Sequence, residues 1–591
     1  MATDAIEKFA VMDERVVAVA PKFAVSKGSL SVTSAKFSAI GESASQINFQ
    51  IIVPSQNIYV DRYITIQTTF ALGFNINAPA LATAAPLAVI GKDLALCAFP
   101  FQSALVQNSS LTINDTSVTL DNQTVVNELL RLTDYKMNRG ARTCPTKLDV
   151  YRNYADGVGS INSPLNTYDT TTAYGEQPNG AFPDLEWVDP NTGLPLTAAS
   201  YVFGGVTVNT SQIGTTGKYQ PVCNTPAGAA TDYPVAIKAT VTEPLLISPC
   251  LFADGFEAEG LFGISNMQLV FNMAANIARV IRTTASVNSF ALLANPYTNS
   301  SVRCSFLTPS LDMPLPSINS VPYQQFARYL SVNASASIAA GATAEIQSQT
   351  ITLPSVPDML LVYAKPIAYT NNQGDFYLPV RGVNVTFDNY TGILSNQTVE
   401  QLFRISQRCG LEVDWETFYG KARMDSGAVV PTVGAPLCLQ MGVDVPLSAG
   451  LAPGVLGSFS LQINMSVQNT GYAAVTGYTL YVTVVNSGFL QSQSGASRLI
   501  LNPLSEADVV SAEVVSRGTV GRLVGHGFLS RLGSMLSKAV DLYSKSKPAV
   551  SAIKGMLPEG KVKDVLGKVG YGMAGGAMPT GGRKMLSERL M

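Results

Sequence analysis

The side chains best suited to chemistry are sparse in this sequence. His526 is the single histidine of the 591 residues, and it lies in the glycine-rich stretch LVGHG (523–527). A Ser-His-Asp or Cys-His mechanism would have to use this residue, which no regular element frames. Carboxylates gather at Asp254, Glu257 and Glu259, but without the spacing of a calcium-binding loop, and they are typical of a solvated loop. We therefore expect neither a catalytic residue nor a metal site.

Cysteine usage and nucleotide motifs lead to the same expectation. The seven cysteines are scattered without a C-x-x-C spacing, and their odd number argues against a complete disulfide framework. They indicate reduced thiols in a cytosolic or nuclear setting. Neither a G-x-x-x-x-G-K-[ST] loop nor a G-x-G-x-x-G turn after a strand is present. The sequence favours a structural or binding protein without a cofactor over an enzyme.

Charge divides the chain into an acidic body and a basic tail. Asp, Glu, Lys and Arg make up 14% of the residues, against roughly 25% in an average soluble domain. From Arg517 to the end there are 13 Lys and Arg against 4 Asp and Glu, while the whole chain has 39 against 41. Such a tail is typical of contact with nucleic acid or an anionic membrane, and a solvated helix face is the alternative.

The elements expected in the body are strands. SQINFQIIV (45–53) and RYITIQTTF (62–70) alternate apolar and polar residues, and YTLYVTVV (478–485) is β-branched and aromatic throughout. Helical stretches between the strand patterns are few and short. The pattern predicts an all-β protein of the sandwich class.

Two pairs of similar stretches indicate an internal repeat. LDNQTVVNELLRL (120–132) resembles LSNQTVEQLFRI (394–405), and GLFGISNMQLVFNM (260–273) resembles GVLGSFSLQINM (454–465). The order of the two stretches is the same in both halves, which predicts two copies of one β-rich fold. The first pair is typical of a strand that leads into a short helix.

Helix-capping residues are expected within the first pair of stretches. Thr124 and Thr398 are the expected N-caps, and Gln401 follows Thr398 at the spacing of a capping box.

The first copy carries an insertion. Asn122 and Asn272 are 150 residues apart, whereas Asn396 and Asn464, at the matching positions, are 68 apart. The additional residues are rich in Gly, Pro, Asn, Thr and Tyr, and they predict a long loop or small excursion at about 140–235, at one end of a sandwich.

The joint between the copies is expected near 285–304, where the periodicity fades. The expected organisation is an N-terminal arm 1–22, a first sandwich 23–290 with the insertion, a second sandwich 291–500, and a linker with the basic tail 501–591.

Several stretches resemble a known family, the major capsid proteins of virophages and polinton-like viruses. The resemblance covers roughly residues 20–490 and follows strand patterns rather than one signature. It is carried by FAVSKGSLSVTSAKFSAIGESASQINFQIIVPSQNIYVDRYITIQ (23–67), the stretches 98–135, 151–168 and 243–280, and in the second half ILSNQTVEQLFRISQRCG (393–410) and 458–488.

The resemblance implies a fold and a function. The fold is a double jelly roll, two jelly-roll β-sandwiches in tandem, which agrees with the internal repeat. Three copies would form a pseudo-hexagonal capsomer, and neighbouring capsomers, penton protein and minor capsid proteins would complete an icosahedral shell around double-stranded DNA. The protein would be assembled inside the host cell and located in the virion.

A secreted or cell-surface carbohydrate-binding adhesin is the alternative. The odd cysteine count disfavours it, and so do the acidic residues in MATDAIEKFAVMDERVV (1–17), where a signal peptide needs a basic region.

The basic tail has the pattern of an amphipathic helix. A helix through this segment would place basic and small polar residues opposite one apolar face. Such a helix suits a membrane interface, and docking of the same face on the capsomer or on a neighbour is the alternative. The expected membrane face comprises Phe528, Leu529, Leu532, Met535, Leu536, Val540 and Tyr543.

Two short motifs bracket this helix and resemble sites of the adenovirus-type maturation protease. In LVGHG the residues are Leu523, Gly525, His526 and Gly527, and in MAGGA they are Met573, Gly575, Gly576 and Ala577. Cuts after His526 and Gly576 would free residues 527–576, which we expect to disturb a host membrane. His526 would then be a subsite residue for the protease. The competing hypothesis keeps the tail attached, where its positive charge meets packaged DNA.

Overall fold

The computed structural model describes most of the body of the chain. The described residues are 31–78, 85–89, 94–96, 101–132, 152, 186–188, 200–203, 206–213, 220–225, 231–251, 260–274, 281–283, 287–309, 317–370, 373–423 and 427–502. The expected arm 1–22, nearly all of the expected linker and tail 501–591, and the carboxylates Asp254, Glu257 and Glu259 lie outside them.

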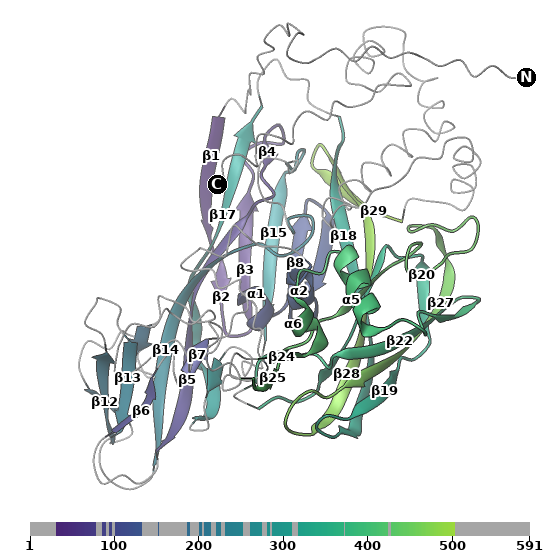
Figure 1. The fold of residues 1–591 in the computed structure, drawn as a ribbon. Helices are drawn as coiled ribbons and strands as arrows, with labels where there is room; N and C mark the ends of the chain where they lie inside the picture. Colours follow the sequence, from purple (N-terminus) through teal and green to yellow (C-terminus); the bar gives the residue numbers. More distant parts are fainter. Residues whose placement is uncertain are drawn as a thin grey trace, which may run out of the picture. The chain divides into compact units, whose positions relative to one another are not determined.

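Two antiparallel sheets form the first roll (Figure 1). One sheet has the order β1 (Ser31–Ser38), β17 (Val287–Thr308), β5 (Thr65–Ala78), β14 (Thr231–Pro244) and β10 (Glu186–Val188), with β4 (Tyr59–Val60) also paired to β17. The other has the order β2 (Gly41–Glu42), β3 (Gln46–Ile52), β15 (Asn266–Met273), β8 (Val106–Ile113) and β9 (Thr116–Asp121). The alternation in β3 buries Ile47, Phe49 and Ile51, as the sequence pattern predicts.

Two further antiparallel sheets form the second roll. One sheet has the order β18 (Asn319–Ile338), β28 (Val475–Gln493), β21 (Met359–Pro366) and β26 (Leu437–Gln440), with β29 (Ala496–Leu501) paired to β28. The other joins β19 (Thr343–Gln347) and β20 (Ile351–Ser355) to β27 (Leu456–Gln468), followed by β22 (Val380–Phe387) and β23 (Tyr390–Ile393).

Strand order identifies both rolls as jelly rolls. In each roll the first long strand pairs with the last long strand. A strand from the middle of the roll pairs with the other side of that last strand, and a fourth strand follows it: β1-β17-β5-β14 and β18-β28-β21-β26. The other sheet of each roll shows the same match. β15 lies between β3 and β8, and β27 lies between β22 on one side and both β19 and β20 on the other. The stretches that repeat in the sequence therefore form equivalent strands, which confirms the all-β double jelly roll.

Short helices also stand at equivalent places. α2 (Asn122–Leu130) follows β9, and α5 (Val399–Arg408) follows β23. The capping box of Thr398 and Gln401 is confirmed. The expectation for Thr124 is wrong: the cap is Asp121, whose side chain accepts hydrogen bonds from both the N–H and the hydroxyl of Thr124. The carboxylate begins the helix three residues earlier than expected. Two shorter helices are α1 (Phe101–Ala104) and α6 (Trp415–Tyr419).

The insertion contains strands as well as connections. β11 (Ser200–Phe203), β12 (Val206–Ile213) and β13 (Gln220–Thr225) form a four-stranded sheet with β6 (Ala85–Val89), which comes from a distant part of the chain. β14 begins at Thr231, close to the expected end of the insertion at about 235, and pairs with β5 along its whole length.

The expected boundary at residue 290 is also corrected. β17 continues through it, and its residues up to Thr308 pair with β1. The second set of sheets begins with β18 at Asn319. The change from the first roll to the second therefore lies between Thr308 and Asn319, and the periodicity fades earlier because the register of β17 against β5 shifts at three places.

Short strand pairs complete the described elements: β7 (Leu94–Leu96) with β16 (Ile281–Thr283), and β24 (Lys421–Arg423) with β25 (Val429–Pro431).

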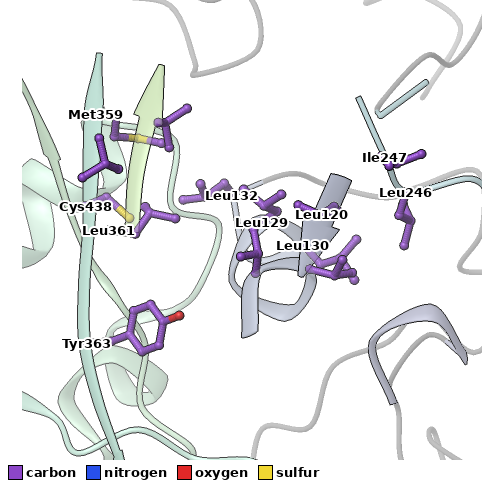
Figure 2. Packing of buried hydrophobic residues seen from close by; sticks show 14 of the residues in the cluster. Leu120, Leu129, Leu130, Leu132, Leu246, Ile247, Met359, Leu361, Tyr363 and Cys438 are labelled. Atoms are coloured by element: carbon purple, nitrogen blue, oxygen red, sulfur yellow. The ribbon is translucent and has the colours of Figure 1, made fainter. Parts of the chain in front are cut away.

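One hydrophobic cluster extends through both rolls (Figure 2). It includes Leu120 and Leu246 of the first roll and Tyr363 and Cys438 of the second. The four cysteines whose side chains the structure describes, Cys250, Cys304, Cys409 and Cys438, are buried and form no disulfide. Burial raises the pKa of the Cys250 thiol to about 12. These thiols are packing groups.

Candidate functional site: the joint between the two rolls

Helix α2 of the first roll lies against β18 and β21 of the second. Tyr363 on β21 donates a hydrogen bond from its hydroxyl to the Thr124 carbonyl at 2.7 Å. On β18, Arg328 pairs with the N-cap Asp121 at 2.7 Å and donates to the Thr124 hydroxyl at 2.7 Å. The residue that begins the helix thus also joins the rolls. Arg328 and Asp121 are each 30% exposed, so this pair is partly screened by water.

A buried ionic cluster lies at the centre of this joint. Nζ of Lys365, on β21, is 2.5 Å from Oε1 of Glu128 on α2 and 2.8 Å from Oδ2 of Asp375. The side chains of Lys365, Glu128 and Asp375 are 6%, 0% and 2% exposed. One ammonium group thus lies between two carboxylates from different rolls, out of reach of water.

Polar neighbours support the cluster. Tyr377 donates from its hydroxyl to Oε1 of Glu128 at 3.0 Å and accepts from Nε of Arg131 at 3.2 Å. Asp375 accepts from Nδ2 of Asn127 at 3.3 Å and from the Tyr369 hydroxyl at 3.2 Å. Burial, and then the Glu128 charge, raises the pKa of the Tyr377 phenol, which therefore stays a neutral donor.

The apolar part of the joint is continuous with both cores. Figure 2 shows Leu129 and Leu132 of the first roll in the same cluster as Met359 and Leu361 on β21. All four are almost completely buried. Leucine packing tolerates small shifts between the two surfaces, whereas the ion pairs of Lys365 require Glu128 and Asp375 at defined positions. The arrangement holds two similar sandwiches at a fixed mutual orientation.

A second contact joins the rolls elsewhere. Ser497, on β29, donates its N–H to Oδ1 of Asp115 at 2.7 Å and its hydroxyl to the Ile113 carbonyl at 2.5 Å. Hydrogen bonds from Ser497 lower the pKa of the Asp115 carboxyl, which sits in the turn between β8 and β9. Two separate contacts restrain the rolls more than one contact would.

Sequence reasoning did not find the ionic cluster, although a weak signal exists. Glu128 interrupts the apolar run of VVNELL, and Lys365 is the one charge in the buried strand MLLVYAKP. A charge in a stretch that must be buried requires a partner. The sequence does not identify that partner.

A buried carboxyl in the first roll is sensitive to pH. Glu243, near the end of β14, accepts hydrogen bonds from the backbone N–H of Phe101 and Gln102 and from Nε2 of Gln102. Burial raises the pKa of Glu243 from 4.5 to about 7, and it outweighs the opposite effect of these donors. The folded state therefore binds a proton more tightly than the unfolded state does.

We expect Glu243→Gln to remove this pH dependence. Because the folded pKa is raised, the stability that protonated Glu243 contributes is present below about pH 4.5 and is lost as pH rises through about 7. The difference in unfolding free energy, variant minus wild type, should increase by about 3 kcal/mol over this interval. Urea unfolding at a series of pH values measures it, with exposed Glu345→Gln as the control. A difference that stays constant with pH would contradict the expectation.

The residues expected to form the processing and membrane sites lie outside the described residues. These are Leu523, Gly525, His526, Gly527, Phe528, Leu529, Leu532, Met535, Leu536, Val540, Tyr543, Met573, Gly575, Gly576 and Ala577. Among the residues that the structure does describe, no three His, Cys, Asp or Glu side chains gather as a metal site. None of the helices in this part of the chain has the length and apolar character of a bilayer-spanning segment.

The double roll with its buried joint has the architecture of viral capsid proteins, and comparisons with known proteins agree. The family described as Sputnik virophage major capsid protein 1st domain matches residues 4–313, and the one described as major capsid protein V20 C-terminal domain matches residues 326–488. The first range ends between β17 and β18, where the structure changes rolls, and the second begins within β18. Capsid protein V20 of Sputnik virophage is 26% identical over 594 positions, which cover 94% of this chain and 92% of that protein.

Solved structures show the same fold. The chain resembles a chain of the Sputnik virophage structure, determined by cryo-electron microscopy, with a TM-score of 0.70 and 23% identity over 89% of this chain and 98% of that one. The mavirus major capsid protein follows, with a TM-score of 0.58 and 13% identity over 88% of this chain and 99% of that one.

This is a double jelly-roll protein of the capsid-forming class. The chain belongs to the Sputnik virophage family of major capsid proteins. Its role is to form the capsid, and its location is the virion.

Proposed function

We propose that three copies of the chain form a pseudo-hexagonal capsomer in which each roll fills one of six corners. The observation that carries this proposal is the repeat of the strand order in two rolls, with a buried joint between them. Each chain contributes two similar rolls at a fixed mutual orientation, so a ring of three chains has six nearly equivalent corners. Such a ring can fill a hexagonal lattice. This role is structural and requires no enzymatic chemistry.

The outer strands of the two rolls favour contacts between copies. β1 and β18, the first long strands of their rolls, both lie at sheet edges. Each exposes a valine: Val32 is 62% exposed and Val332 is 63% exposed. Apolar side chains on equivalent edges favour a contact between the first roll of one copy and the second roll of the next copy. Such contacts form a closed ring after three copies.

The mass of the purified protein in solution tests this proposal. Light scattering coupled to size exclusion should give three times the monomer mass of 62.6 kDa. Val332→Lys should shift the mass toward the monomer, because it places charges in the interface, whereas Val429→Lys, an exposed valine on β25, serves as the matched control. A monomer of the wild-type protein that binds glycans would instead support the adhesin alternative.

In the particle, we propose further contacts with neighbouring capsomers, a penton protein and minor capsid proteins. The conserved architecture of the family supports a shared shell, while the partners themselves follow from the resemblance seen in the sequence.

For the tail, we propose that a maturation protease cuts after His526 and Gly576, and that the freed peptide acts on a host membrane. The two glycine motifs on either side of an amphipathic pattern support this proposal. Intact mass spectrometry of protein from assembled particles should find a main chain that ends at His526 and a separate 527–576 peptide. A chain that continues to Met591 would overturn the cleavage and favour an attached tail that meets DNA or a membrane.

A further inference from the structure

Arg152 belongs to the first-roll segment between α2 and β10, and it contacts the second roll with its side chain and its backbone. Its guanidinium carbon lies 3.7 Å from the centre of the Phe376 ring. Its Nη1 donates a hydrogen bond to Oδ1 of Asn469 at 2.9 Å. The residue is 3% exposed, which is rare for arginine unless a site is built around it.

The backbone of Arg152 is held by the same region. Its N–H donates to the Pro431 carbonyl at 3.2 Å, and its own carbonyl accepts from the Gly374 N–H at 2.7 Å. β25 and the connection that precedes β22 therefore hold the backbone of Arg152, and Phe376 of the same connection contacts its side chain.

The receiving residues form a socket with its own internal support. Nδ2 of Asn469 donates to the carbonyls of Ile338 and Ala473 at 2.9 and 2.8 Å, which directs Oδ1 toward the arginine. Gly471 donates its N–H to the same Oδ1 at 3.1 Å. A Cβ at Gly471 would lie 2.0 Å from Nη1 of Arg152, so any larger residue would collide with the guanidinium. The socket therefore needs an aromatic face, an oriented acceptor and a bare glycine.

We propose that Phe376, Asn469 and Gly471 form a guanidinium-binding socket that holds Arg152 of the same chain. The planar guanidinium can stack on a ring and donate at its edge at the same time, whereas a lysine ammonium cannot do both. The socket couples the insertion of the first roll to the second roll. This coupling concerns the single chain and does not depend on the proposed trimer.

The socket also connects to the ionic cluster. Gly374 and Phe376, which contact Arg152, alternate with Asp375 and Tyr377, which contact Lys365 and Glu128. One four-residue stretch of the second roll therefore binds the helix and the insertion of the first roll. Loss of the Arg152 contact should therefore weaken the ionic cluster, and loss of the ionic cluster should weaken the Arg152 contact.

A double-mutant cycle tests the socket directly. Gly471→Ala should lower the melting temperature by several degrees in the wild-type background, because the new methyl group displaces the guanidinium. In the Arg152→Ala background the same substitution should shift it by less than about one degree, since the colliding group is gone. Arg152→Gln replaces Arg152→Ala if the alanine variant does not fold. Equal shifts in the two backgrounds would overturn the proposal.

Chemical rescue gives an independent readout. Methylguanidinium at tens of millimolar should raise the melting temperature of Arg152→Ala by several degrees relative to wild type, and methylammonium should not. Arg381→Ala is the matched control, because Arg381 also lies over a ring, that of Tyr419 at 4.2 Å, but is only half-buried. Rescue that is equal for both variants, or absent for Arg152→Ala, would show that no guanidinium-specific socket exists.

Discussion

Replacing Lys365 with methionine is expected to lower the free energy of unfolding by about 3–5 kcal/mol. The substitution keeps an unbranched side chain of nearly the same length but removes the ammonium between Glu128 and Asp375. Both carboxylates would then be buried, close together and without their shared cation. Their mutual repulsion and lost solvation both destabilise the joint, and urea unfolding measures the loss.

Arg328→Met is the matched control for this experiment. Arg328 also pairs across the joint, with Asp121, but the two side chains are each 30% exposed. Its loss should cost about 0–1 kcal/mol, because water already screens the pair. If Lys365→Met cost no more than Arg328→Met, the buried cluster would not be the element that fixes the joint.

Replacing Leu129 with alanine is expected to cost about 2–5 kcal/mol and to uncouple the two rolls. Leu129 packs at the joint in the shared hydrophobic cluster (Figure 2). A cavity there weakens the contact between the rolls more than the interior of either roll. The rolls should therefore unfold in two transitions instead of one.

The chain allows each roll to be followed separately. Its two tryptophans are Trp187, on β10 of the first roll, and Trp415, on α6 of the second. Fluorescence of variants that keep one tryptophan reports on one roll at a time. Leu461→Ala, on β27 in the opposite sheet of the second roll, is the control: it should cost a similar free energy while the two probes stay coincident. Coincident transitions in Leu129→Ala would contradict the uncoupling.

The repeat could be predicted from the sequence because equivalent strands preserve equivalent patterns. The stretches at 260–273 and 454–465 form β15 and β27, at the same place in their sheets. The capping box at Thr398 could also be predicted from the sequence, since its two partners lie three residues apart. The cap at Asp121 was missed because Thr124 occupies the position that matches Thr398 in the second copy.

Features that depend on distant residues could not be predicted. The boundary at 290 was wrong because bulges in β17 break the two-residue alternation that marks a strand. The sheet in the insertion depends on β6, which precedes it by more than one hundred residues. For the same reason the socket was not foreseen: Arg152 and Asn469 are 317 residues apart.

Cryo-electron microscopy of purified particles can show how the chain fills the capsomer. We expect three-fold capsomers with six corner densities, in which each chain passes through two neighbouring corners and the contacts of Lys365 with Glu128 and Asp375 join them. Capsomers that contain six chains, or chains whose two rolls occupy corners that are not neighbours, would contradict this expectation.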